Sequence, residues 1–311
     1  MDAGFTTSFD GARLFTRTWL PAGDSVGVLQ IVHGMAEHSG RYEAFAKRLT
    51  AAGWAVYAHD HRGHGHTAVD AGALGHLADQ GGWNRAVRDL GVIGEIARGA
   101  HPGRPLVLFG HSMGSLLVRD YLRDHSGRAD AVVLSGAPSE KSAVLTAVGR
   151  AVAEAEARLR GPRERSVLMN SLTFGLFNRD FRPARTQFDW LSRDPAQVDA
   201  YIADPLCGGV PTVQFFRDLL FGLRLVNSPE ALRDVRRDLP VYLLFGEMDP
   251  AAERGRGARR LRAALLAAGV TDVTLKLYPG GRHEMLNEIN ADEVTDDLIG
   301  WLEERRARLA G

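Results

Sequence analysis

Short apolar runs alternate with helical patterns along most of this chain, and this alternation limits the possible folds more than any other feature. Four of the runs, rich in Val, Ile and Leu, occupy residues 26–34, 54–60, 105–110 and 129–136. Helical periodicity lies between them, near residues 41–52, 83–100 and 115–125. Strands buried on both faces read as continuous apolar runs, and helices between such strands imply parallel pairing. The sequence therefore predicts an α/β fold with a mostly parallel, doubly wound sheet.

The alternation stops after Gly136 and resumes at residue 239. The second part contains apolar runs at 239–246 and 273–280, each followed by a predicted helix, at 257–268 and up to 308. At the other end, residues 4–20 read as two alternating strands joined at Asp10-Gly11, a dipeptide that favours hairpin turns. We therefore expect a core in two parts, 1–136 and 239–311, and an inserted, mainly helical cap at 137–238.

The bulk properties fit a globular chain with a large core. Of its 311 residues, 45% are apolar and 24% charged, and the formal net charge of +0 removes any electrostatic case for nucleic acid or an anionic membrane. The N-terminus has no leader pattern and no apolar run approaches the length of a membrane span, so we expect neither a signal peptide nor a transmembrane helix. The single cysteine, Cys207, excludes an internal disulfide and is typical of the reducing cytoplasm, where we expect the protein.

Two apolar stripes with helical spacing lie inside the predicted cap. One comprises Val144, Leu145, Val148 and Val152, and the other Val213, Phe216, Leu220 and Leu223. The favoured interpretation is that both stripes pack the cap onto the main domain. The alternative is a lid that also exposes apolar surface, which would allow transient contact with a membrane or micelle.

A single serine stands where the third apolar run meets its helix. Ser112 is flanked by Gly110 and Gly114 in GHSMG, which fits the G-x-S-x-G pattern at the strand-to-helix junction that this pattern requires. Glycines are needed there because the turn is so tight that a Cβ would collide with neighbouring backbone. The pattern alone is weak evidence, but its position favours a nucleophilic serine over a glycine-rich turn with an incidental serine.

A serine nucleophile requires a histidine base and an acid that orients it. Of the 11 histidines, only His283 lies beyond position 125, and it follows the last predicted strand in the loop YPGGRHE. The acid should follow the preceding strand, where the chain reads LLFGEMDP. Asp249 is the favoured acid and Glu247 its competitor. All these loops leave the carboxyl ends of parallel strands, where open α/β sheets build their sites.

Two backbone N–H groups should bind the oxyanion that forms on the substrate. One belongs to Met113, at the start of the helix after the serine, and the other to Met35, in the loop after the first parallel strand. Each donor is expected to stabilise the transition state by about 3–4 kcal/mol. The methionine side chains are immaterial to this role and would line an apolar pocket instead.

Several motifs together resemble one branch of the α/β-hydrolases, that of the monoacylglycerol lipases and lysophospholipases. They are HGMAEHSGRY, HDHRGHG, GHSMG, the DP of GEMDP and the GGRHE loop, and the resemblance extends over nearly the whole chain. It implies an eight-stranded sheet, a cap over the catalytic pocket and a catalytic triad of Ser112, Asp249 and His283. The implied substrates are single-chain acyl esters, above all monoacylglycerol, which is cleaved to fatty acid and glycerol.

The resemblance also implies a binding site for the alcohol part of the substrate. Glu37 and Arg41 of EHSGRY would shape the polar end of the pocket, and Tyr201 matches a position that faces glycerol in some members. Mammalian monoglyceride lipases carry a further histidine three residues after the catalytic one, but this chain has Leu286 there. Lysophospholipase or general esterase activity by the same mechanism therefore stays open.

Other readings of the sequence compete with this one. The cluster of His59, His61, His64 and His66 suggests a metal site, but Gly63 stands where the metallo-β-lactamase pattern needs aspartate, so we expect a structural role and no metal.

A prolyl aminopeptidase would need cap carboxylates for the substrate ammonium group, and the candidates are Asp189, Asp194, Asp199 and Asp204. A cofactor-free haloperoxidase and a non-catalytic ligand receptor complete the alternatives. We expect no cofactor, and the expected binding partner is a small acyl ester. Cys207 is expected to be a buried inert thiol. The sequence does not predict the oligomeric state.

Overall fold

The computed structural model describes residues 1–140, 142–228 and 230–309. Within these residues the strands form one eight-stranded sheet in the order β1-β2-β4-β3-β5-β6-β7-β8. The strands are β1 (Asp2–Thr7), β2 (Arg13–Trp19), β3 (Gly27–Val32), β4 (Trp54–His59), β5 (Leu106–His111), β6 (Ala131–Ser135), β7 (Val241–Gly246) and β8 (Val273–Tyr278). β1 and β2 form the predicted hairpin at one edge, and β2 pairs with β4 antiparallel. The other pairs are parallel, as the alternation predicts.

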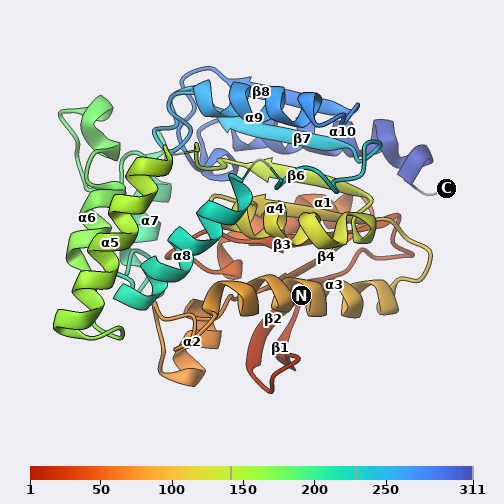
Figure 1. Ribbon diagram of the computed structural model, residues 1–311. Helices are drawn as coiled ribbons and strands as arrows, with labels where there is room; N and C mark the ends of the chain where they lie inside the picture. The colour runs from red at the N-terminus through yellow and green to blue at the C-terminus, as the bar shows by residue number, and fades with distance from the viewer. Residues whose placement is uncertain (141, 229, 310–311) are drawn as a thin grey trace.

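Helices cover both faces of this sheet, which is why the central strands β3 to β7 are buried along their whole length and mostly apolar (Figure 1). The helices of the main domain are α1 (Glu43–Ala51), α2 (Gly65–Ala71), α3 (Gly82–Ala100), α4 (Met113–His125), α9 (Arg256–Ala267) and α10 (Ala291–Leu309). Along β5, Leu106 and Leu108 pack with α3, α4 and α9, whereas Val107 and Phe109 pack with α1 and α10. This alternation follows from the two-residue period of a strand. The sequence predicted all of these helices except the short α2.

Short 3-10 turns complete the main domain. They are η1 (Ser39–Tyr42), η2 (Ser126–Arg128) and η4 (Met285–Asn287). Two of them, η1 and η4, adjoin loops of the candidate site. None of the helices in the described ranges is long and apolar enough to cross a membrane.

The segment between β6 and β7 contains the remaining helices. They are α5 (Ala143–Arg160), α6 (Val167–Phe174), η3 (Phe177–Phe181), α7 (Pro195–Ala203) and α8 (Val213–Val226). Figure 1 shows α5, α6 and α7 to one side of the sheet, while α8 runs back to it. At Gly222 on α8, an added Cβ would lie 2.1 Å from the ring of Trp83, so α8 packs closely on α3. We propose that residues 137–238 form the cap and that 1–136 and 239–311 form the core.

The two predicted apolar stripes of this segment behave differently. Val213 and Phe216 on α8 are buried in the main core, as the packing interpretation predicts. On α5 that interpretation holds only for Val152, which packs against the main core, and is wrong for Val144, Leu145 and Val148, which are 75%, 57% and 54% exposed. The physical reason is that α5 extends beyond the sheet, so this end of its apolar stripe has no neighbour to cover it (Figure 1).

Candidate active site

Ser112 lies in a strained turn between β5 and α4. Its backbone has φ 50° and ψ −120°, a region that residues with a side chain rarely adopt. A Cβ on Gly114 would lie 1.9 Å from the carbonyl oxygen of Val32, and one on Gly110 would lie 2.8 Å from that of Gly114. Both glycines of the motif are therefore required by close backbone contacts, as the sequence predicted.

His283 and Asp249 reach Ser112 from two other loops. The Nε2 atom of His283 lies 3.0 Å from the Ser112 hydroxyl oxygen, and its Nδ1 lies 3.0 Å from each carboxylate oxygen of Asp249. Asp249 is fully buried and His283 nearly so. Glu247, the competing acid, is exposed. With Nδ1–H donating to Asp249, Nε2 is left to accept the serine hydroxyl, which is the arrangement that a general base needs.

The surroundings of His283 favour its protonated form. Burial lowers the pKa of His283, but the charge and hydrogen bond of Asp249 outweigh burial and raise the pKa above its ordinary value. A second buried imidazole, His111, has its ring centre 4.9 Å away. Burial, with a smaller contribution from His283, lowers the pKa of His111 to about 3, so its ring stays neutral beside the base.

The loop that carries Met35 approaches Ser112 closely. A Cβ on Gly34 would lie 3.2 Å from the Cβ of Ser112. Met113 is the first residue of α4, so its N–H is one of those that have no partner within the helix. These positions fit the expected pair of oxyanion donors, Met35 and Met113, and we retain that assignment as a proposal.

Tyr201 holds this loop from the cap side. Its hydroxyl donates to the carbonyl oxygen of Ala36 at 2.9 Å and accepts from the N–H of Gly208 at 3.1 Å. The same carbonyl accepts the Gly208 N–H at 2.9 Å, and Ala36 has a positive φ of 55°. Tyr201 lines the cavity, but its hydroxyl is engaged with the loop that follows Met35 rather than free for glycerol.

Glu37 and Arg41 form a buried network with a residue that the sequence analysis did not single out. Arg41 donates to Glu284 at 2.7 and 2.6 Å and to Glu37 at 2.9 Å. Glu37 also accepts from the N–H of Gly34 at 2.5 Å and from the hydroxyl of Tyr42 at 2.8 Å. The only sequence signal for Glu284 is its place directly after His283 in GGRHE.

Ser112 and His283 open onto a cavity of about 460 Å³ between the main domain and the cap. Its apolar wall includes Phe174, Phe188, Trp190 and Leu191, and its polar wall includes Asn170, Asn178, Thr186 and Gln187. Glu37 and Glu284 also line it. The ring of Trp190 lies 5.0 Å from that of His283, so the cap reaches the catalytic base directly. A cavity of this size accommodates a small-molecule substrate.

Comparison with known proteins decides the family. A family model described as serine aminopeptidase, S33, matches residues 23–290. The chain belongs to this family of α/β-hydrolases. The match spans both parts of the predicted core and the whole predicted cap.

Individual relatives extend this result. A monoacylglycerol lipase of Mycolicibacterium smegmatis is 34% identical, over 94% of this chain and 93% of that protein. Human monoglyceride lipase is 27% identical, over 96% of this chain and 89% of that protein. The solved structure of a thermostable carboxyl esterase from Bacillus coagulans in complex with glycerol has a TM-score of 0.90 at 27% identity, covering 97% of this chain and 98% of that one. The predicted branch, fold and enzyme class, a carboxylic ester hydrolase, are thereby confirmed.

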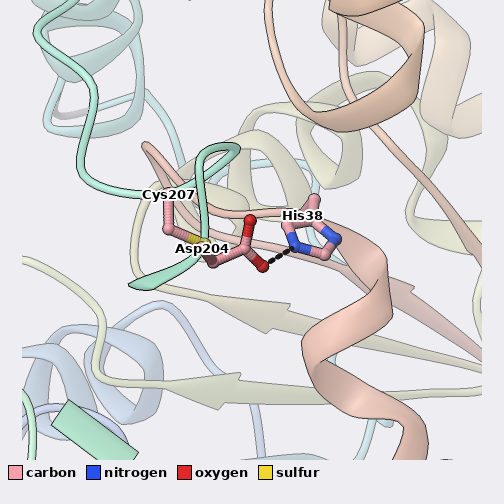
Figure 2. A group of neighbouring side chains, drawn as sticks. All are labelled: His38, Asp204 and Cys207. Carbon is pink, nitrogen blue, oxygen red and sulfur yellow. Dashed lines mark hydrogen bonds and ion pairs between the residues drawn. The ribbon is translucent and has the colours of Figure 1, made fainter. Parts of the chain in front are cut away.

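A trio of possible metal ligands lies where the EHSGRY loop meets the cap. Within the described residues, ligand atoms of His38, Asp204 and Cys207 lie within 4.8 Å of one another (Figure 2). His38 accepts the N–H of Gly40 at Nδ1, at 3.2 Å, so its proton sits on Nε2 and donates to Asp204 at 2.8 Å. A metal bound at Nε2 would move that proton to Nδ1. There it would face the N–H of Gly40, which needs Nδ1 as its hydrogen-bond acceptor. We therefore interpret the His38–Asp204 contact as a hydrogen-bonded link between the loop and the cap.

The thiol of Cys207 fits the inert role that the sequence suggested. Burial raises the pKa of Cys207 well above its usual range, which disfavours the reactive thiolate. Its side chain packs near the aromatic cap residues Phe188, Trp190 and Tyr201. It is only partly buried, however, and not fully enclosed as expected.

The histidine cluster after β4 has the structural role that we expected. His61 and His64 are buried, and His61 bonds to the ring of His59 at 3.0 Å and to the carbonyl of His33 at 3.1 Å. Asp60 accepts the backbone N–H groups of neighbouring loops. His66 differs from the other members, because it is exposed.

The four cap aspartates proposed for an aminopeptidase all have other partners. Asp189 accepts backbone N–H groups of its own turn, and Asp194 caps α7. Asp199 pairs with Arg185, and Asp204 bonds to His38. None is among the residues that line the cavity in the described part of the chain. These contacts leave none of the four aspartates poised for a substrate ammonium group.

Proposed function

We propose that this enzyme hydrolyses single-chain acyl esters, foremost monoacylglycerol to fatty acid and glycerol, through an acyl-enzyme on Ser112. The observation that carries the proposal is the hydrogen-bonded series Ser112–His283–Asp249 at the wall of a partly apolar cavity. The similarity to the mycobacterial monoacylglycerol lipase supports the choice of substrate.

The geometry suggests the following reaction. The ester carbonyl oxygen lies between the N–H groups of Met35 and Met113, and Ser112 attacks the carbonyl carbon while His283 takes its proton. Asp249 stabilises the imidazolium that forms. The tetrahedral intermediate collapses, and the alcohol leaves with the proton of His283. Water activated by the same histidine then attacks the acyl-enzyme and releases the fatty acid.

The charge of the cavity wall beside the triad favours a neutral alcohol group. Two carboxylates, Glu37 and Glu284, line the cavity there, and the guanidinium of Arg41 pairs with both. The exposed Arg182 also lines the cavity, but from the cap segment. The two carboxylates would repel a phosphate group placed beside them. An acyl chain in the same place would remove water from these charges, which is unfavourable. We therefore infer that the glycerol group lies at the end of the cavity beside Glu37 and Glu284.

The exposed apolar surface of the cap supports transient contact with a lipid surface. The residues concerned are Val144, Leu145 and Val148 on α5 and Val167, Leu168 and Leu172 on α6, all about half exposed or more. The two helices lie side by side in Figure 1 and contact each other. Exposed apolar side chains in such number are typical of interaction sites. We propose that this surface docks on micelles or membranes that contain the substrate.

A turnover profile tests the proposal. Monoacylglycerols of increasing chain length, lysophospholipids, triacylglycerols and prolyl anilides should be compared at equal enzyme concentration. We expect monoacylglycerols to be cleaved fastest, and Ser112→Ala to abolish turnover and labelling by a fluorophosphonate. Faster cleavage of prolyl anilides would favour the aminopeptidase, and ester turnover by Ser112→Ala near the wild-type rate would disprove the assigned nucleophile.

A further inference from the structure

Glu284 is a buried carboxylate next to the catalytic histidine. It follows His283 directly, is 6% exposed, and accepts two hydrogen bonds from Arg41 and one from Asn287 at 3.0 Å. Its backbone N–H donates to the carbonyl oxygen of Leu191 in the cap at 2.8 Å. Arg41 and Asn287 therefore hold the side chain at the cavity wall, and the guanidinium that it binds comes from a distant part of the chain.

Arg41 links Glu284 to the loop that carries Met35, the proposed oxyanion donor. Besides binding Glu284, its guanidinium donates to one oxygen of Glu37, and the other oxygen of Glu37 accepts the N–H of Gly34. Gly34 shares a peptide unit with Met35, whose N–H is the proposed donor. A continuous series of charge-assisted hydrogen bonds thus joins the residue after the base to the residue before the oxyanion donor.

Folding alone does not require such a network. A buried ion pair is often no more stabilising than well-packed apolar residues of similar volume, because its charges must be desolvated. This site buries three charged side chains in one place, Glu37, Arg41 and Glu284. The arrangement is explained if it fixes geometry, since oxyanion donors act only when they are held at the right position before the reaction.

We propose that Glu284 is a positioning residue that, through Arg41 and Glu37, holds the Met35 N–H in place relative to Ser112 and His283. The inference rests on the function proposed above for the Ser112 site. Tyr201 fixes the carbonyl of Ala36 from the cap, so the short loop is held from both sides. Glu284 acts on the side that faces the catalytic base.

The network has a second, electrostatic consequence that can be measured. After the dominant effects of burial and Asp249, the charges of Glu284 and Glu37 further raise the pKa of His283. Removing the charge of Glu284 should therefore lower that pKa and move the acid limb of kcat/KM to lower pH. This shift arises from the charge alone and shows that Glu284 acts on the base, whereas a loss of kcat and of labelling rate at nearly constant KM tests the positioning.

Glu284→Gln tests the inference in the full-length protein, because glutamine keeps the shape and loses the charge. Fluorophosphonate labelling rate, kcat, KM and the pH profile should be measured with a glycerol monoester. We expect kcat and the labelling rate to fall about 10- to 100-fold, as for a small misplacement of catalytic groups, with KM changed by less than about threefold. The acid limb should shift to lower pH.

Asp89→Asn is the matched control. Asp89 is equally buried and accepts two hydrogen bonds from Arg62, but it lies on α3 and not on a catalytic loop. We expect its kcat and pH profile to stay close to wild type. Arg41→Lys is the second variant in case Glu284→Gln does not fold, since lysine keeps the charge but cannot bind both carboxylates in a fork, and it should lower kcat similarly.

The outcomes separate the inference from the proposed function. Wild-type kcat and an unshifted acid limb in folded Glu284→Gln would overturn the inference, as would an equal loss of kcat in Asp89→Asn. If the wild-type enzyme neither cleaves esters nor reacts with the fluorophosphonate, the proposed function itself fails.

Discussion

The Nδ1 atom of His283 lies 3.0 Å from both carboxylate oxygens of Asp249, which is fully buried. A carboxylate so placed fixes the tautomer of the ring and stabilises the imidazolium. Asp249→Asn should therefore lower kcat by about 10⁴-fold with little change in the fold, measured by steady-state turnover and circular dichroism. Glu247→Gln is the control, since Glu247 is exposed and should tolerate the change. A comparable loss in Glu247→Gln would make Glu247 the orienting acid instead.

The backbone strain at Ser112 predicts a gain of stability when glycine occupies this position. At φ 50° and ψ −120°, glycine avoids steric strain that serine and alanine both carry. Ser112→Gly and Ser112→Ala should both be inactive. The glycine variant should nevertheless have a free energy of unfolding about 1 kcal/mol higher than the alanine variant. This figure is the relief of backbone strain minus the entropy cost of glycine, whose unfolded chain is more flexible. Chemical denaturation measures the difference. Equal stability of the two variants would show that the strain does not exceed the entropy cost of glycine and would contradict the prediction.

The parts of the site that the sequence predicted are those set by local rules. Ser112, Asp249 and His283 each follow a parallel strand, and the carboxyl ends of such strands meet at one edge of the sheet, so their convergence follows from order along the chain. The pairing of Arg41 with Glu284 has no such rule, because it joins residues 243 positions apart through side chains alone. The exposure of Val148 was missed for a related reason. Helical spacing shows that a face is apolar but not whether another element covers it.

The contacts of Tyr201 predict that it acts on catalysis rather than on glycerol. Its hydroxyl binds the backbone of Ala36 and Gly208. Tyr201→Phe should lower kcat about tenfold, to the same extent for a glycerol ester and a methyl ester of one fatty acid, because the loop of Met35 is loosened for both. The assay compares kcat and KM for the two esters.

A glycerol contact would produce a different result. The loss would then appear with the glycerol ester and not with the methyl ester, and it would appear mainly in KM. Tyr57→Phe is the matched control, because the hydroxyl of Tyr57 binds His101 at the C-terminal end of α3, and this change should leave turnover unchanged.

Buried neutral histidines predict a loss of stability in mild acid. Burial lowers the pKa of His33, His59, His61, His64 and His111, in the last case to about 3. Below about pH 6.5 the unfolded chain binds protons at these sites that the folded protein does not. The free energy of unfolding should therefore fall, as pH drops below 6.5, by about 1.4 kcal/mol per pH unit for each such histidine.

His283 contributes with the opposite sign. Its pKa is raised in the folded protein, so its stabilising contribution is complete below about pH 6.5 and is lost as the pH rises through the folded pKa. The raised pKa of His283 does not offset the lowered pKa values of the five other histidines, so the free energy of unfolding should still fall in mild acid. Urea denaturation between pH 7 and pH 5 measures the balance, and a constant free energy of unfolding over this range would contradict the prediction.

The apolar surface of the cap predicts a difference between dispersed and membrane-bound substrate. Leu145 and Val148 on α5 are 57% and 54% exposed, and inserting them into lipid would remove apolar area from water. Changing both to serine should lower binding to neutral vesicles, and turnover of monoacylglycerol within them, about tenfold. Turnover of a short, water-soluble ester should stay unchanged, because neither side chain lines the cavity. Ile96→Ser is the control, since Ile96 is 43% exposed on α3 of the main domain. Equal loss in this control, or equal loss on the soluble ester, would show that the cap surface has no special part in docking.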